Sequence, residues 1–217
     1  MTGTPIGIFG GTFDPPHYGH LRPALELAEG LDMEQMHMLP ANMPPHRPQP
    51  EASAQQRLAM LRLAVADEPR LVVDERELQR PGPSYMADTL QSLRDDYPDT
   101  PLCLCLGMDA FLQLHRWHQW QRIAELAHIV VAHRPGWALG ETPLMAAELA
   151  AWYTSCRVDS PEPLRQALAG RVWLQQVSQL AISATEIRRR IAAGLSVRYL
   201  LPEPVWHYIQ QQQLYSK

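Results

Sequence analysis

Short apolar segments alternate with longer helical patterns along most of this chain, and this alternation constrains the fold more than any other feature. The strand-like segments are residues 6–9, 35–40, 71–74, 101–107, 128–133 and 171–177. Between them lie segments with apolar residues at helical spacing, such as 21–30, 54–67 and 85–97. Strands that alternate with helices of about 10–15 residues are typical of βαβ units, so we expect an α/β fold built on a parallel sheet.

The length of the chain favours a single domain spanning residues 1–217. With 217 residues, of which 46% are hydrophobic, the chain can bury a core without disulfides or a structural metal. Residues 136–170 are less regular, and we expect a peripheral insertion there. Residues 183–217 contain two helical patterns, which predict a small C-terminal helical part. Five prolines between residues 40 and 50 predict a loop.

The basic residues exclude several kinds of chemistry. Lys217 is the only lysine among 19 basic residues, and the other eighteen are arginines. A P-loop lysine, a Schiff-base lysine within the chain and a lysine general base are therefore excluded. An anion would have to be bound by arginine, histidine or backbone N–H groups. The net charge of −4 gives no overall basic field, so we expect neither nucleic acid nor a membrane as a partner.

The three cysteines indicate neither disulfides nor zinc. Cys103, Cys105 and Cys156 form no CxxC pair, and their number is odd. Strand alternation would place Cys103 and Cys105 on the same face of a strand. We expect buried, reduced thiols. No signal peptide or run of about 18 apolar residues is found, so a cytoplasmic location is expected.

The first strand-like segment leads into GGTFDPPHYGH, residues 10–20. Two adjacent glycines let the backbone approach an anion, and the following helix offers free N–H groups at its start. His17 and His20 are three residues apart and should point to the same side of that helix. In an isolated H-x-x-H, one histidine capping the helix and one packed ring would be the simpler interpretation. The position after the first strand instead favours a ligand site, because open α/β sheets bind ligands at the carboxyl ends of their strands.

A second candidate segment, ISATEIRRR, spans residues 182–190. Ser183 and Glu186 have the spacing of a capping box, so a helix should begin there. Thr185 would then be the second residue of the helix, and Arg188 could reach an anion at its N-terminus. The alternative is a capped helix with a solvated arginine face. We expect Arg188 to be functional and Arg189 and Arg190 to face solvent.

Together these two segments resemble the signatures of the HxGH nucleotidyltransferases. GGTFDPPHYGH is similar to G-x-F-D-P-x-H-x-G-H, and ISATEIR is similar to S-x-T-x-[IV]-R, which ends the active site in that superfamily. ANMPPHR, SYMADTL, GMDAF, the Trp117 segment, HRPG and the closing LPEPVWHYIQQQQLY follow in the order seen in bacterial nicotinate-mononucleotide adenylyltransferases. The resemblance covers residues 6–215. It implies a Rossmann-like, doubly wound parallel sheet with helices on both faces.

The resemblance also implies adenylyl transfer from ATP to nicotinate mononucleotide, giving deamido-NAD and pyrophosphate. A phosphate is already a nucleophile at neutral pH, so catalysis consists of positioning and charge neutralisation. The implied catalytic residues are His17, His20 and Arg188. The implied ATP-binding residues are Gly10, Gly11, Thr12, Phe13, His17, His20, Arg47, Gly107, Asp109, Ile182, Ser183, Thr185 and Arg188. Mg²⁺ is expected to be carried with ATP, without dedicated protein ligands.

The mononucleotide needs a stacking surface and a partner for the nicotinate carboxylate. Trp117 matches the stacking tryptophan of the family, whereas Trp120 is expected to be a core residue. The carboxylate is expected on backbone N–H groups near residues 85–86 and 118. The implied mononucleotide-binding residues are Thr12, Asn42, His46, Tyr85, Met86, Asp109, Trp117, His118 and Arg134.

Two positions depart from the pattern of the family. Many relatives have threonine where this chain has Met86, and we expect no effect if the backbone holds the carboxylate. Arg47 stands where relatives have lysine after the histidine, and arginine keeps the charge. The oligomeric state is not assigned.

Other members of the superfamily remain as alternatives. A relative acting on nicotinamide mononucleotide is the closest of these, and relatives acting on phosphopantetheine or an alcohol phosphate lack the pyridine-side segments. A class I aminoacyl-tRNA synthetase core would need a lysine-rich second signature and an anticodon-binding extension, and this sequence shows neither. A catalytically silent nucleotide-binding module is expected to have lost His17, His20 or Arg188, and all three are present.

Overall fold

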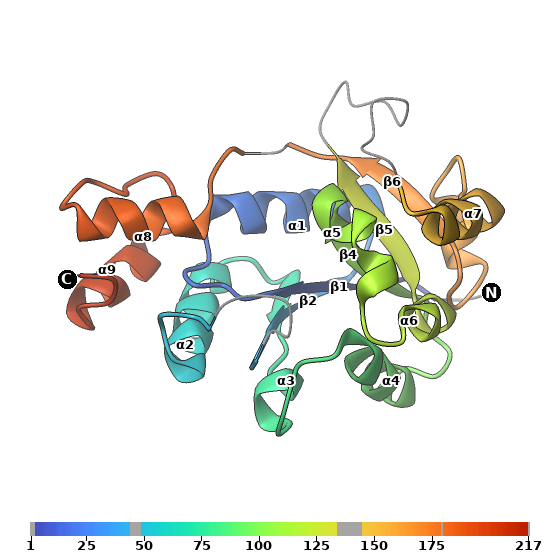
Figure 1. Cartoon of the computed structure of the whole chain (residues 1–217), viewed down its shortest axis with the longest axis horizontal. Helices are drawn as coiled ribbons and strands as arrows, with labels where there is room; N and C mark the ends of the chain where they lie inside the picture. Colours follow the sequence, from blue (N-terminus) through green and yellow to red (C-terminus); the bar gives the residue numbers. More distant parts are fainter. Residues whose placement is uncertain (1–2, 44–48, 134–144, 179, 217) are drawn as a thin grey trace.

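One parallel sheet organises the molecule (Figure 1). The computed structural model describes residues 3–43, 49–133, 145–178 and 180–216. Within these ranges, six strands hydrogen-bond in the order β3-β2-β1-β4-β5-β6, and each neighbouring pair is parallel. The strands are β1 (Ile6–Gly11), β2 (Gln35–Pro40), β3 (Leu71–Val73), β4 (Leu102–Gly107), β5 (His128–His133) and β6 (Val172–Gln176). All six coincide with strands expected from the sequence.

The strand order confirms the doubly wound fold. From β1 the chain adds β2 and β3 on one side, and then returns past β1 to add β4, β5 and β6 on the other. The direction of winding therefore reverses between β1 and β4. In open α/β sheets, a crevice forms at this reversal, outside the carboxyl ends of the two strands. Here these ends are Gly11 and Gly107.

Helices cover both faces of the sheet. The longer helices are α1 (Tyr18–Gly30), α2 (Ala54–Val65), α4 (Met86–Asp96), α6 (Trp120–Leu126), α7 (Ala147–Cys156), α8 (Ala184–Ala192) and α9 (Glu203–Gln211). The short helical segments are α3 (Arg76–Gln79), α5 (Met108–Leu112), η1 (Leu114–Arg116) and η3 (Glu162–Arg165). Of these, α3 and η3 were not expected from the sequence, because four residues are too few to show a helical period.

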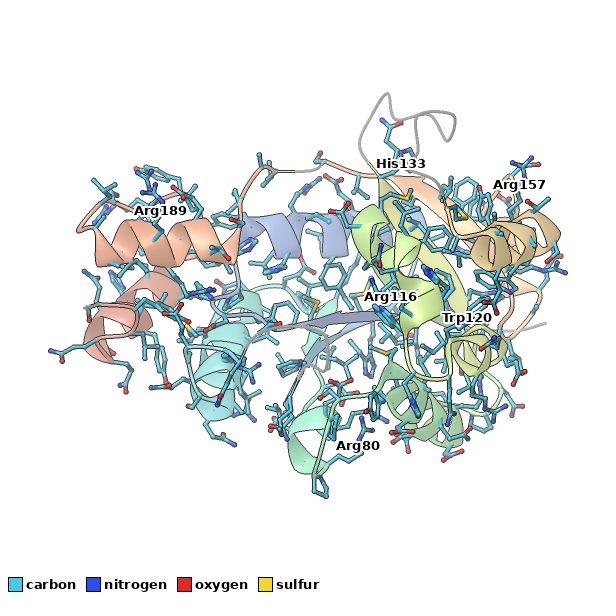
Figure 2. All side chains as sticks on the ribbon, viewed as in Figure 1. Arg80, Arg116, Trp120, His133, Arg157 and Arg189 are labelled. Carbon is cyan, nitrogen blue, oxygen red and sulfur yellow. The ribbon has the colours of Figure 1, made fainter. Side chains whose placement is uncertain are left out.

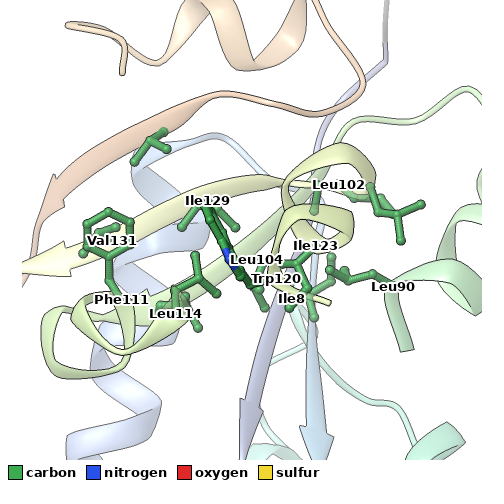
Figure 3. Close-up of a cluster of buried hydrophobic side chains, with 14 of the residues drawn as sticks. Ile8, Leu90, Leu102, Leu104, Phe111, Leu114, Trp120, Ile123, Ile129 and Val131 are labelled. Carbon is green, nitrogen blue, oxygen red and sulfur yellow. The ribbon is translucent and has the colours of Figure 1, made fainter. Parts of the chain in front are cut away.

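Alternation along β4 separates two hydrophobic clusters. Leu102, Leu104 and Leu106 belong to a cluster with buried residues of α4, α5, α6 and α7. Figure 3 shows part of this cluster, including Leu102 and Leu104. Cys103 and Cys105 point the other way, into a cluster formed with α1 and α2. The two thiols are free and buried on one face, as expected. Burial raises the pKa of Cys105 to about 12, so its thiol stays protonated and unreactive.

The C-terminal helices form a third hydrophobic cluster beside the sheet. Ile187 of α8 and Val205 and Ile209 of α9 pack with Met60 of α2. At the other end of the molecule, α7 buries Tyr153 within the α4–α7 cluster. Within the described ranges, no helix is both long and apolar enough to cross a membrane.

Candidate functional site

Three glycines mark the crevice between the carboxyl ends of β1 and β4. Gly10 and Gly11 end β1, and Gly107 ends β4. A Cβ added at Gly107 would meet no atom within 4 Å, so the space above β4 is open. A Cβ at Gly10 would lie 3.1 Å from Cε of Met86, which places the start of α4 beside the end of β1. The expected backbone approach site therefore has α4 as one of its neighbours.

The two histidines of the motif lie together at the start of α1. Their rings stack, with centroids 3.8 Å apart and an angle of 25° between the ring planes. His17 is the N-cap residue, but its side chain makes no capping hydrogen bond, and its Nδ1 is buried without a partner. Desolvation lowers the pKa of His17 to about 4, so its imidazole is neutral at pH 7. A neutral ring can still donate one hydrogen bond to an anion.

Phe13 supports the second histidine from the side. Its ring meets the His20 ring edge-on, with centroids 5.1 Å apart, and it is almost fully buried. The backbone of Phe13 has φ 52°, a left-handed conformation that is uncommon for a bulky residue. The surrounding packing must hold this conformation, because strain of this kind persists only where the structure enforces it. The loop between β1 and α1 is therefore shaped by its burial.

Gly19 brings the two sequence motifs together. A Cβ at this position would lie 2.9 Å from the carbonyl oxygen of Ile182 and 2.9 Å from the ring of His17. Only glycine allows the segment before α8 to pass this close to α1. In addition, the backbone N–H of Tyr18 donates to the carbonyl oxygen of Leu200, at 3.1 Å. The N-termini of α1 and α8 thus meet at the same place (Figure 1).

The start of α8 agrees with the sequence in part. Ser183 is the N-cap, and its hydroxyl accepts a hydrogen bond from the backbone N–H of Glu186 at 3.2 Å. Thr185 is the second helical residue, as expected, and its side chain is exposed. The reciprocal half of the capping box is wrong, because the Glu186 carboxylate pairs with Arg189 instead, at 2.7 Å. Arg189 lies on the exposed outer surface of α8 (Figure 2).

Arg188 points from α8 to the loop after β1. Its Nη1 donates to the backbone oxygen of Asp14 at 2.8 Å, and its Nε donates to the Glu51 carboxylate at 2.6 Å. The side chain is 22% exposed, compared with 63% for Arg189. The structure therefore distinguishes Arg188 from its neighbour. The partner of its guanidinium, Asp14, precedes His17 by three residues in the loop.

A set of hydrogen bonds around Asp14 holds this loop, and we call it the Asp14 network. Its members are Asp14, Glu51, Arg57, Arg188 and Tyr215. The buried Asp14 carboxylate accepts from the backbone N–H groups of Glu51 at 2.8 Å and Ala52 at 3.1 Å. It also accepts from the Tyr215 hydroxyl at 2.7 Å. With these donors in place, Asp14 fixes the loop and is not a free ligand.

Arg57 is the most deeply buried charged member of the network. It is 1% exposed, and its Nη1 donates to the carbonyl oxygen of Thr12 at 2.8 Å. Its Nη2 donates to the carbonyl oxygen of Asn42 at 3.2 Å. Desolvation lowers its pKa, whereas the nearby Asp14 charge opposes this shift. Arg57 thus ties the loop after β1 to the loop after β2.

Aromatic rings form the other side of the crevice, and we call this side the aromatic side, defined by Tyr85, Met86, Trp117 and His118. The rings of Tyr85 and His118 lie with centroids 4.3 Å apart and planes at 32°. Trp117 follows η1 and is half-buried against the α4–α7 cluster, whereas Trp120 is a core residue with 6% exposure. Tyr85 is the N-cap of α4, and its side chain makes no capping hydrogen bond. It therefore does not occupy the backbone N–H groups at the start of α4.

Asn42 connects the two sides, and Asp109 follows the end of β4. The backbone N–H of Asn42 donates to the Ser84 hydroxyl at 2.9 Å, and its side-chain amide donates to the carbonyl oxygen of Arg80 at 3.4 Å. Asn42 is therefore bonded to the segment before α4 and, through Arg57, to the loop after β1. Asp109 is exposed in the first turn of α5, directly after β4. His46, Arg47 and Arg134 lie outside the described residues.

Arg57, Glu51 and Tyr215 were not recognised as site residues from the sequence, and Asp14 had no expected role. A signal for Arg57 was present, because Arg57, Leu61 and Val65 lie on one stripe of α2, and all three are buried. A charged residue on a buried stripe needs polar partners. Tyr215 gave no such signal, since its partner is 201 residues away in the sequence.

Comparisons with known proteins agree with this architecture. A family model described as cytidylyltransferase-like matches residues 8–190. A protein of Aeromonas salmonicida named "Probable nicotinate-nucleotide adenylyltransferase" is 48% identical over 216 residues, which cover 100% of this chain and 99% of that protein. A protein of Methylococcus capsulatus with the same name is 47% identical over 213 residues, which cover 98% of this chain and 100% of that protein.

A solved structure has the same fold. Plasmodium falciparum nicotinic acid mononucleotide adenylyltransferase complexed with NaAD has a TM-score of 0.73 to this chain and covers 98% of both chains. The sequence identity is 14%, so this similarity concerns the fold alone.

Proposed function

Since this chain belongs to the cytidylyltransferase-like family and, within it, to the nicotinate-nucleotide adenylyltransferases, we propose that it transfers the adenylyl group of ATP to nicotinate mononucleotide. The products are deamido-NAD and pyrophosphate, and the reaction belongs to NAD biosynthesis. One observation carries this proposal. The stacked His17 and His20 rings, the N-terminus of α8 and Arg188 converge at the carboxyl end of β1. Such a convergence suits a polyphosphate.

In the proposed reaction, a phosphate oxygen of the mononucleotide attacks the α-phosphorus of ATP in line. A new P–O bond forms there, while the bond from the α-phosphorus to the α,β-bridging oxygen breaks and leaves its electron pair on pyrophosphate. No proton has to be removed from the nucleophile at neutral pH. The protein therefore needs no general base, and its contribution is orientation and stabilisation of charge.

The described residues divide this work as follows. The neutral His17 and its stacked neighbour His20 donate hydrogen bonds to the phosphates around the reacting phosphorus. Arg188 and the N–H groups at the start of α8 hold the leaving β and γ phosphates. The backbone of Gly10 and Gly11 is proposed to lie along the phosphates, while a Cβ at these positions would point at Met86 or at the Phe13 ring. Because desolvation keeps His17 uncharged, it contributes a hydrogen bond to the phosphates but no positive charge.

The mononucleotide is proposed to bind on the aromatic side. Trp117 offers a face for the pyridine ring, and the uncapped start of α4 at Tyr85 and Met86 offers N–H groups to the nicotinate carboxylate. The Met86 side chain carries no hydrogen-bond donor, so the backbone is the source of acid recognition. Asn42 and Asp109 are proposed to contact the ribose and phosphate between the two sides.

Mg²⁺ is proposed to enter with the triphosphate and to neutralise part of its charge. In the part of the chain that the structure describes, no group of three or more His, Cys, Asp or Glu side chains is placed to hold a metal ion. The carboxylate of Asp14 is already occupied by hydrogen bonds, and Asp109 stands alone at the start of α5. This arrangement of carboxylates fits an ion whose ligands are phosphate oxygens and water. A cytoplasmic location is part of the same proposal.

The test is pyrophosphate release by the purified protein with ATP, Mg²⁺ and either nicotinate or nicotinamide mononucleotide. We expect release with nicotinate mononucleotide and formation of deamido-NAD, identified by its mass. Faster pyrophosphate release with nicotinamide mononucleotide would show that this mononucleotide is the preferred substrate. Release with neither, despite binding of ATP, would identify a non-catalytic nucleotide-binding module.

A further inference from the structure

The end of the chain adopts a conformation that needs strong interactions to hold it. After α9, Gln213 and Tyr215 have φ values of 51° and 61°, in the left-handed region. This region is unfavourable for side chains with a Cβ, and most of all for bulky ones. The backbone N–H of Leu214 donates to the carbonyl oxygen of Ile209 at 3.0 Å, which turns the chain back toward the protein. Tyr215 is thereby directed inward.

The hydroxyl of Tyr215 ends at the loop that carries the catalytic motif. It donates to the Asp14 carboxylate at 2.7 Å, and this bond spans 201 residues of sequence. Burial and the neighbouring Asp14 charge raise the pKa of Tyr215 far above its usual range. The phenol therefore keeps its proton and donates it in the hydrogen bond to Asp14.

Asp14 connects Tyr215 to Arg188, because both side chains donate hydrogen bonds to it. The two remaining donors to the Asp14 carboxylate are backbone N–H groups of the segment before α2, which have fixed positions. The backbone oxygen of the same residue accepts from Arg188 Nη1 at 2.8 Å, and the Arg188 guanidinium lies 3.8 Å from the Asp14 carboxylate. A shift of the Asp14 backbone would therefore move the acceptor of Arg188 as well as the loop that ends at His17.

We propose that Tyr215 is a positioning residue for the ATP triphosphate, acting through Asp14 on Arg188 and on the loop before His17. This inference rests on the proposed function. The C-terminal segment thus takes part in the site without contact with the substrates: it fixes the orientation of the guanidinium that receives the β and γ phosphates. Loss of the Tyr215 hydroxyl leaves one lone pair of a buried carboxylate without a partner, and Asp14 will then shift to find another donor.

The test compares Tyr215→Phe with Tyr208→Phe. Tyr208 lies on α9 in the same C-terminal cluster, so its substitution removes a hydroxyl from the same part of the protein but not from the Asp14 network. For Tyr215→Phe we expect the KM for ATP to rise about tenfold, with the KM for the mononucleotide unchanged. Tyr208→Phe should keep both constants. A purely structural role would lower the fraction of folded enzyme, and hence the apparent kcat, without a change in KM, and this result would overturn the proposal.

A double-mutant cycle tests whether the effect travels through Arg188. If it does, Tyr215→Phe should change the KM for ATP by less than about twofold when Arg188 is already alanine. An undiminished effect in that background would contradict the proposed route.

ATP binding by titration calorimetry, without the second substrate, separates this inference from the proposed function. If the wild-type protein binds ATP but transfers nothing, the function is wrong. About tenfold weaker ATP binding by Tyr215→Phe would still support the positioning role, and equal binding would refute it.

Discussion

The two sides of the candidate site are held together by different forces. On one side, the loop after β1 is fixed by the Asp14 network, in which charged side chains, backbone N–H groups and carbonyl groups meet in hydrogen bonds of 2.6–3.2 Å. On the aromatic side, Tyr85 and His118 meet through their rings, and Trp117 packs against the apolar cluster. The loop after β1 is thus held by directional hydrogen bonds to charged groups, and the aromatic side is held by the packing of its rings.

This difference has consequences for function. A buried hydrogen bond to a charge has one productive geometry, and its loss leaves a polar group without a partner. Ring packing tolerates small displacements, because dispersion and hydrophobic contact are not directional. We therefore expect substitutions beside the Asp14 network to change turnover or ATP binding. Substitutions on the aromatic side should change the binding and choice of the second substrate.

The largest effect is expected at His20. His20→Ala should lower kcat about 100-fold or more, since it removes a preorganised group beside the reacting phosphorus. Steady-state rates of pyrophosphate release measure this. His207→Ala, an exposed position on α9, is the matched control and should keep the wild-type kcat. A turnover of His20→Ala close to that of the control would remove His20 from the mechanism.

The buried His17 should make stability depend on pH. Its pKa is about 4 in the folded protein, compared with the ordinary histidine pKa of 6.5 in the unfolded chain, so the unfolded chain binds more protons between these values. The free energy of unfolding should therefore fall as the pH is lowered from about 6.5 to about 4, by at most about 3 kcal/mol. Urea denaturation across this range measures the slope.

A variant isolates the contribution of His17 to this slope. His17→Asn removes the titrating group, so its unfolding free energy should decline less steeply than that of the wild type over the same pH range. Equal slopes in both proteins would mean that His17 is not held neutral in the folded state.

Two glycine substitutions compare the sides directly. In Gly19→Ala, the new Cβ would meet a backbone carbonyl oxygen and the His17 ring at 2.9 Å, and neither can move freely. In Gly10→Ala, it would meet the flexible end of Met86 at 3.1 Å. We expect kcat/KM for ATP to fall about tenfold or more for Gly19→Ala and less than about threefold for Gly10→Ala. A larger loss of kcat/KM for ATP in Gly10→Ala than in Gly19→Ala would contradict this difference between the two sides.

The smallest effect is expected at Met86. If backbone N–H groups at the start of α4 recognise the nicotinate carboxylate, Met86→Thr should change the ratio of kcat/KM for nicotinate over nicotinamide mononucleotide by less than about twofold. Competition between the two mononucleotides in one reaction gives this ratio. A tenfold gain in preference for the acid would show that a hydroxyl at this position contributes to recognition.

Local sequence patterns were sufficient to predict the sheet. Strands β1, β2, β4 and β5 have buried runs, and β4 shows its two faces in the alternation of Leu104 with Cys103 and Cys105. The edge strands β3 and β6 are mostly half-buried, but their apolar residues were sufficient to locate them. The position of Gly-Gly, His17 and His20 directly after β1 led to the prediction of a ligand site there, because doubly wound sheets bind ligands at the carboxyl ends of their strands. The short helix α3 was missed, since its four residues carry no period.

The interactions that hold the site could not be predicted in the same way. Tyr215 and Asp14 meet only because α9 folds back beside the sheet, and no local pattern encodes a contact of this kind. Glu186 had the spacing of a capping box, but Arg189 on the same helix offers its carboxylate two charged donors and competes successfully. Arg57 could have been recognised from its position on the buried stripe of α2.

The division of the site between its two sides can be tested most directly by measuring both Michaelis constants for Arg188→Ala and Trp117→Ala in parallel. We predict that the KM for ATP rises about tenfold or more only in Arg188→Ala, and that the KM for nicotinate mononucleotide rises to a similar extent only in Trp117→Ala. A crossed pattern, with Trp117→Ala impaired in ATP binding or Arg188→Ala impaired mainly in mononucleotide binding, would contradict the placement of the two substrates.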